Sequence, residues 1–183
     1  MGRARVALSR GTVKRHSEAV GLLTGPGEYA FVKRGVLRSI VMRCPDDCGE
    51  IVTINLDRRS GPAWRIYQRN GHLTVYPSVW RSTGCRSHFI ISQDNVFWCD
   101  SGDAYEESTK ELMAQIFAIL PAHNALPRHY EDIASEMEAI PWEVLWACNS
   151  LERMGRAVSS DKGTMFRRAS SRVPKRRTLD IFG

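Results

Sequence analysis

The hydrophobic pattern changes its period near residue 103, so the chain should contain two kinds of structure in succession. Residues 28–99 hold short runs rich in β-branched and aromatic residues, such as EYAFV, EIVTINL and HFIIS, separated by turn sequences such as GPG and QDN. RNG between WRIYQ and HLTVY is typical of a β-hairpin. We therefore expect a small antiparallel β domain over residues 25–102.

Beyond residue 103, apolar residues recur at helical spacing in ESTKELMAQIFAIL, YEDIASEMEAI and PWEVLWACNSLERMG. The third segment should begin at Pro141 and end at Gly155. RAV and TMFRRA then read as two short strands joined by SSDKG. Three helices followed by a hairpin is the order of a winged helix-turn-helix domain. The alternative is a generic helical hairpin packed on the β domain.

The predicted fold class is α+β, a zinc-stabilised antiparallel β domain followed by a winged helix-turn-helix domain. The predicted domains are a basic N-terminal arm at 1–24, the β domain at 25–102, the winged helix at 103–169 and a basic tail at 170–183. No apolar run reaches 18 residues, the minimum for a membrane-spanning helix, and the N-terminus lacks the apolar core of a secretory signal. We expect a cytoplasmic protein.

Two short motifs carry most of the cysteines. The chain has five cysteines, and an odd number in a reducing compartment favours metal binding over a disulfide framework. CPDDC supplies Cys44 and Cys48, and CRSH supplies Cys85 and His88. Two ligands from each of two turns suit a tetrahedral structural zinc site. We predict zinc on these four residues, with Cys99 as the reserve thiolate ligand.

Two other interpretations of these residues stay open. Cys85 and His88 could form a nucleophile and base, but no orienting third group is evident. A fully ligated zinc has no open position for catalysis. The cysteines could also be buried thiols with no joint role, as we expect for Cys148 on the inner face of a helix. We predict no catalytic residue and rank an enzyme last.

Charge is uneven along the chain, whose net charge is +6. Residues 129–155 carry six acidic residues and one basic residue. Phosphate repels such a surface, so the helical segment favours protein partners. Exposed tryptophans are also typical of protein-binding surfaces, although Trp142 and Trp146 could pack against the β domain instead. The predicted partner-binding residues are Trp142, Glu143, Trp146 and Arg153.

Nucleic-acid binding is the alternative function. Residues 156–183 carry eight basic residues and two acidic ones, and wings or tails of this kind grip phosphate backbones. The candidate nucleic-acid contacts are Arg156, Lys162, Arg167, Arg168, Lys175, Arg176 and Arg177.

The run from RCPDDCGE to PSVWRSTGCRSHF resembles a family of small bacterial zinc-ribbon-like proteins. The resemblance covers roughly residues 25–100, and Asp47 stands where that family would have a glycine. Members are encoded beside a ubiquitin-like modifier, its activating enzyme and a conjugating enzyme. The resemblance implies that setting and those partners, but no activity. We expect a non-enzymatic adaptor that binds other proteins, with a ligase-like accessory role in conjugation.

Overall fold

The computed structural model describes residues 2–100 and 109–170. The chain divides into two compact units, Met1–Tyr105 and Glu106–Gly183. The change of hydrophobic period near residue 103 thus coincides with the boundary between the units. None of the described helices is long and apolar enough to cross a membrane.

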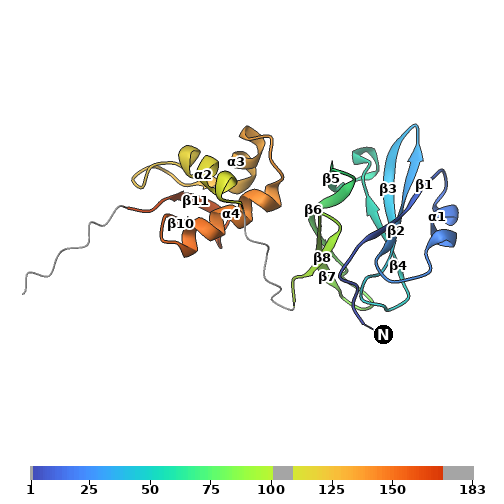
Figure 1. Ribbon diagram of the computed structural model, residues 1–183. Coiled ribbons are helices and arrows are strands. Elements are labelled where there is room, and N and C mark those ends of the chain that lie inside the picture. Colours follow the sequence, from blue (N-terminus) through green and yellow to red (C-terminus); the bar gives the residue numbers. More distant parts are fainter. Residues whose placement is uncertain (1, 101–108, 171–183) are drawn as a thin grey trace, which may run out of the picture. The chain divides into compact units, whose positions relative to one another are not determined.

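The first unit contains two four-stranded sheets (Figure 1). The first has the order β1-β2-β3-β4, with β1 parallel to β2 and the other pairs antiparallel. The second is antiparallel in the order β5-β6-β7-β8. The strands of the first sheet are β1 (Leu8–Val13), β2 (Glu28–Arg34), β3 (Val36–Arg43) and β4 (Ile51–Asn55). Those of the second are β5 (Arg65–Arg69), β6 (His72–Trp80), β7 (His88–Ser92) and β8 (Asn95–Trp98). A 3₁₀ turn, Arg58–Ser60, lies between β4 and β5.

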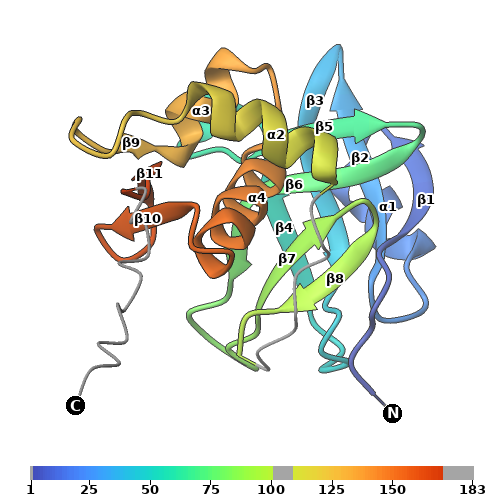
Figure 2. The ribbon, with the colours of Figure 1, turned by 60° about the vertical axis from the view of Figure 1, so that its left-hand side comes forward.

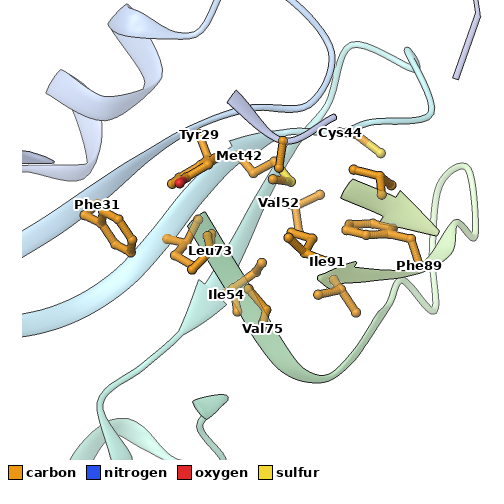
Figure 3. Packing of buried hydrophobic residues seen from close by; sticks show 14 of the residues in the cluster. Tyr29, Phe31, Met42, Cys44, Val52, Ile54, Leu73, Val75, Phe89 and Ile91 are labelled. Carbon is orange, nitrogen blue, oxygen red and sulfur yellow. The ribbon is translucent and has the colours of Figure 1, made fainter. Parts of the chain in front are cut away.

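Side chains from both sheets share one hydrophobic core. Met42 and Val52 of the first sheet and Leu73 and Phe89 of the second belong to a single buried cluster (Figure 3). Cys44 belongs to the same cluster, directly after β3. The turn predicted at RNG is confirmed, since Arg69 pairs with His72 and both Asn70 and Gly71 have positive φ angles.

Helix α1, His16–Leu22, covers the other face of the first sheet, where Ala19 packs in a second buried cluster. The segment predicted as an N-terminal arm, residues 1–24, therefore contains β1 and α1. It also joins the two sheets. The amide of Ala7 donates to the carbonyl of Asp94 at 2.7 Å, and that of Leu8 donates to Gly27 at 3.0 Å.

The second unit contains three helices and a small sheet (Figure 2). The helices are α2 (Lys110–Ile119), α3 (Tyr130–Glu136) and α4 (Pro141–Arg153). The strands β9 (Arg128–His129), β10 (Ala157–Ser160) and β11 (Met165–Arg168) form an antiparallel sheet in the order β10-β11-β9. Pro141 occupies the first turn of α4, as predicted, and Gly155 follows its end with φ +68°.

Cys148 lies on the buried face of α4, as predicted. Val144, Cys148 and Leu151 are fully buried, and burial raises the pKa of the Cys148 thiol to about 12. Met154 is half exposed because it lies at the C-cap, where the helix ends before Gly155.

Candidate active site and cysteine cluster

The hairpin of β6 and β7 carries a serine and a histidine on one face. Val79 pairs with Phe89 across the two strands, and both side chains lie in the core. Successive residues of a strand point to opposite faces, so Ser78 and His88 point away from that core. The register of β6 against β7 shifts between Val75 and Val79. Bulges of this kind re-aim side chains and are frequent beside active sites.

Ser78 and His88 are in direct contact. The Oγ of Ser78 lies 3.0 Å from the Nε2 of His88, and both residues are half-buried. A neutral imidazole with Nε2 unprotonated accepts this hydrogen bond from the hydroxyl. On the other side of β6, the indole Nε1 of Trp64 donates to the carbonyl of Ser78 at 3.2 Å, which fixes the backbone. A serine hydroxyl held against an imidazole is the arrangement of an activated nucleophile and its base.

The carboxylate of Asp100 interacts electrostatically with His88. Hydrogen bonding from Arg3 is the main cause that lowers the pKa of Asp100, and the interaction with His88 lowers it further when the imidazole is protonated. Two nitrogens of Arg3 donate to the carboxylate at 2.9 and 3.0 Å. The amide of Cys99, next in sequence, donates to the carbonyl of His88 at 3.0 Å. Within the described residues, the histidine forms a dyad with Ser78, and Asp100 contributes charge nearby.

Three cysteines meet beside this hairpin. Cys44 is buried and Cys85 is half-buried, and their sulfurs lie 3.6 Å apart. Cys48 completes a group whose three sulfurs all lie within 4.8 Å of one another. The turn from Cys44 to Cys48 closes through the amide of Asp47, which donates to the carbonyl of Cys44 at 3.2 Å. Asp47 has φ +60°, a left-handed conformation that glycine adopts without steric cost.

Polar groups around the sulfurs set their ionisation. Burial raises the pKa of Cys44 to about 11. Burial also opposes ionisation of Cys85, but hydrogen bonds from Ser87 and the neighbouring thiols outweigh it and lower its pKa to about 7. The Nη1 of Arg81 lies 3.1 Å from the Cys85 sulfur and 3.4 Å from that of Cys48. Glu50 in turn pairs with Arg81.

The cysteine group fits a soft metal ion. A tetrahedral zinc with Zn–S bonds of about 2.3 Å spaces its sulfurs roughly 3.8 Å apart, close to the separation of Cys44 and Cys85. The guanidinium of Arg81 can balance the negative charge of three thiolates on one Zn²⁺. Of the predicted ligands, Cys44, Cys48 and Cys85 come together, whereas His88 and the reserve Cys99 are not members of the group.

The predicted partner-binding residues lie in and around α4. Trp142 and Trp146 are only 8% and 6% exposed, while Glu143 is half-buried and Arg153 is exposed. Arg153 donates to the hydroxyl of Ser150 at 2.9 Å. The burial leaves little tryptophan surface for a docked protein, and the role of these four residues stays a prediction.

Several of the candidate nucleic-acid contacts form bonds within the second unit. Arg168 donates to the carbonyls of Phe117 and Ala118 at 3.0 and 2.6 Å, and Arg167 donates to that of His123 at 2.5 Å. The guanidinium of Arg156 lies 4.1 Å from the centre of the Phe117 ring. Lys162 is exposed. Lys175, Arg176 and Arg177 lie outside the described residues.

Sequence reasoning missed Ser78, although PSVWRSTGCRSHF contains it together with His88. The sequence motif indicated Cys85, three positions from His88, as the candidate nucleophile. The useful signal is the pairing of two adjacent strands, which brings residues ten positions apart into contact.

Comparisons with known proteins bear on this same stretch. No curated protein and no solved structure matches the chain. A family model does match residues 15–99, a stretch that contains Ser78, His88 and the three clustered cysteines. Over residues 15–99 the chain is similar to the family described as bacterial ubiquitination-like system serine protease (BubE), which links this unit to bacterial ubiquitination-like systems.

Proposed function

We propose that the first unit is a serine hydrolase that acts in a bacterial ubiquitination-like pathway, with Ser78 as nucleophile and His88 as general base. The observation that carries this proposal is the 3.0 Å contact between Ser78 Oγ and His88 Nε2. The contact lies inside the stretch that matches a serine protease family of such systems. This proposal departs from the expectation of a non-enzymatic adaptor, in which an enzyme ranked last.

The chemistry follows from the two side chains. Ser78 Oγ attacks the carbonyl carbon of an ester or amide, and its proton passes to His88 Nε2. The resulting imidazolium gives that proton to the leaving oxygen or nitrogen as the carbonyl–heteroatom bond breaks, which leaves Ser78 acylated. Water then attacks the acyl-enzyme as His88 takes its proton. His88 returns this proton to Ser78 Oγ as the Oγ–acyl bond breaks, which releases the acid product and free serine.

The acyl group that suits this setting is the C-terminus of a ubiquitin-like modifier. A conjugation pathway joins that C-terminus to other molecules through ester or amide bonds, and a hydrolase of the pathway must accept these conjugates as substrates. The proposed partners are therefore the modifier and the proteins that carry it, including its activating or conjugating enzyme.

The cysteine group would hold zinc beside the dyad in a structural role. Cys44, Cys48 and Cys85 come from two separate loops, so a shared ion would tie the end of β3 to the loop that leads into His88. Metal binding to a preformed cluster stabilises the folded state because the unfolded chain lacks the site.

We also propose that the second unit is a winged helix that serves as the adaptor. The sheet order β10-β11-β9 and the sequence α2, β9, α3, α4, β10, β11 support this assignment. Protein is favoured over nucleic acid as its partner because the guanidinium groups of Arg167 and Arg168 already donate hydrogen bonds to main-chain carbonyls of their own unit. In this arrangement the adaptor brings a protein substrate to the hydrolase.

Covalent labelling tests the hydrolase. A fluorophosphonate probe should label the wild-type protein at Ser78, detected by mass spectrometry of tryptic peptides. Ser78→Ala should remove the label, and His88→Ala should slow labelling at least a hundredfold, the smaller end of what a general base contributes. Ser9→Ala is the matched control, because Ser9 is an exposed serine of β1 outside the site. Labelling that persists in Ser78→Ala would refute the assignment.

A further inference from the structure

An exposed tryptophan lies beside the dyad. Trp80 is 69% exposed, and it is the only exposed residue among the phenylalanines, tyrosines and tryptophans in the ranges 2–100 and 109–170. Isolated apolar residues on a surface are ordinary, but tryptophan has a large apolar area and is enriched where proteins bind partners. The position of Trp80 relative to Ser78 and His88 therefore decides whether it can contact a bound substrate.

Trp80 shares its face of the hairpin with both members of the dyad. It follows Ser78 by two positions on β6, so the two side chains point the same way and their Cα atoms are roughly 6.6 Å apart. It is also the cross-strand partner of His88. The centres of the Trp80 and His88 rings are 6.2 Å apart, with the ring planes inclined at 45°.

These contacts leave most of the indole uncovered at one side of the nucleophile. A substrate whose carbonyl carbon sits at Ser78 Oγ has its next few atoms within reach of that ring. An apolar group in this position loses contact with water when it lies on the indole. Uncharged polar groups and anions gain nothing comparable there, whereas a cation would gain only its attraction to the face of the ring.

We propose that Trp80 forms the apolar wall of an acyl-binding subsite and that the enzyme prefers substrates with an apolar group next to the scissile carbonyl. The inference rests on the serine-hydrolase function proposed above and adds a specificity-determining residue to it. In a protein substrate, the group bound there would be the apolar side chain of the residue that contributes the carbonyl.

Esters of increasing acyl length test the subsite. The probes are p-nitrophenyl acetate and p-nitrophenyl butyrate, which differ by two methylene groups in the acyl part alone. For the wild-type protein, kcat/KM should be roughly tenfold higher for the butyrate, as expected for contact with an apolar pocket. Trp80→Ala should reduce this ratio to about one, mainly through a higher KM for the butyrate, while the acetate value changes little.

Two further variants separate the subsite from damage to the fold. Trp80→Phe keeps an aromatic wall and should retain most of the preference. Val36→Ala removes a half-exposed apolar side chain elsewhere in the same unit and should behave as wild type. If Trp80→Ala proves unstable, the phenylalanine variant and the chain-length preference of the wild type still test the proposal.

The outcomes distinguish a failure of the subsite proposal from a failure of the hydrolase proposal. A wild-type protein that hydrolyses both esters equally, or a Trp80→Ala variant that keeps the preference, overturns the subsite and leaves the hydrolase standing. A wild-type protein that hydrolyses neither ester, and that a fluorophosphonate does not label, overturns the hydrolase and the subsite with it.

Discussion

The hydroxyl of Ser78 and the imidazole of His88 meet across a single β-hairpin, with 3.0 Å between Oγ and Nε2. Val79 and Phe89, their neighbours in sequence, are paired in the core beneath them. The core therefore holds the backbone of both reactive residues. Such a dyad owes its geometry to packed strands rather than to a loop.

Removal of both dyad residues should cost little more than removal of one. Ser78→Ala and His88→Ala should each abolish ester hydrolysis to within the background, because the base acts only through the nucleophile. The double variant should show the same residual rate. Steady-state assays with p-nitrophenyl acetate measure this, and a double variant at least tenfold slower than either single variant would show that the two residues act independently.

Zinc content should separate the roles of His88 and the cysteines. Protein purified without added metal should contain about one zinc per chain by elemental analysis. Cys44→Ser should lower the zinc content and the melting temperature, whereas Cys99→Ser, which alters an exposed cysteine outside the cluster, should change neither.

His88→Ala decides between two interpretations of the histidine. If it serves the dyad alone, the variant keeps its zinc and loses hydrolysis. Loss of both would make His88 the fourth zinc ligand, as CRSH first suggested.

Protonation of Glu28 should make the protein less stable in acid. A hydrogen bond from Arg10 is the main cause that lowers the pKa of this carboxyl to about 2, and the Thr24 amide adds to it. The folded state thus favours the ionised form, so this stabilisation is complete above the unfolded pKa of about 4.3 and disappears as the pH falls towards 2. Urea unfolding at several pH values should show that loss.

Glu28→Gln provides the control for this pH dependence. The variant should be less stable than wild type at pH 7, and the difference should shrink towards pH 2. Glu111→Gln, at an exposed position in α2, should follow the wild-type curve. A constant difference at all pH values would assign the effect to lost packing instead.

Gly27→Ala should destabilise the first unit. Gly27 has φ +80°, and a Cβ there would lie 2.5 Å from the carbonyl oxygen of Val6. Left-handed backbone and this clash together should cost roughly 1–3 kcal/mol of unfolding free energy. Gly21→Ala is the matched control, since nothing lies within 4 Å of its Cβ and alanine favours the helix. Equal melting temperatures for the two variants would contradict the structure.

Local sequence patterns predicted the elements well and the site only in part. The hairpin at Asn70–Gly71 and the start of α4 at Pro141 depend on nearby residues, so they could be read directly. The proximity of Cys44 and Cys85 was expected because both end predicted strands. The partner of His88 could not be predicted, because the register shift of β6 determines which side chain faces it.

The N-terminal strand illustrates a second limit. The sequence predicted a basic N-terminal arm over residues 1–24, which include Arg3 and Arg10. In the structure Arg3 binds Asp46 and Asp100, and Arg10 binds Glu28. Charge counted along a chain does not reveal which charges are already paired in the folded state.

The contact between Val6 and Asn95 has a consequence for how the unit forms. A ribosome makes residue 6 long before residue 95, so this edge of the sandwich stays open while most of the unit is being synthesised. Pairings so distant in sequence raise the contact order and slow folding. During that interval the exposed edges of the sheet are open to wrong partners. The nascent unit should therefore depend more on chaperones than the mostly local helices that follow it.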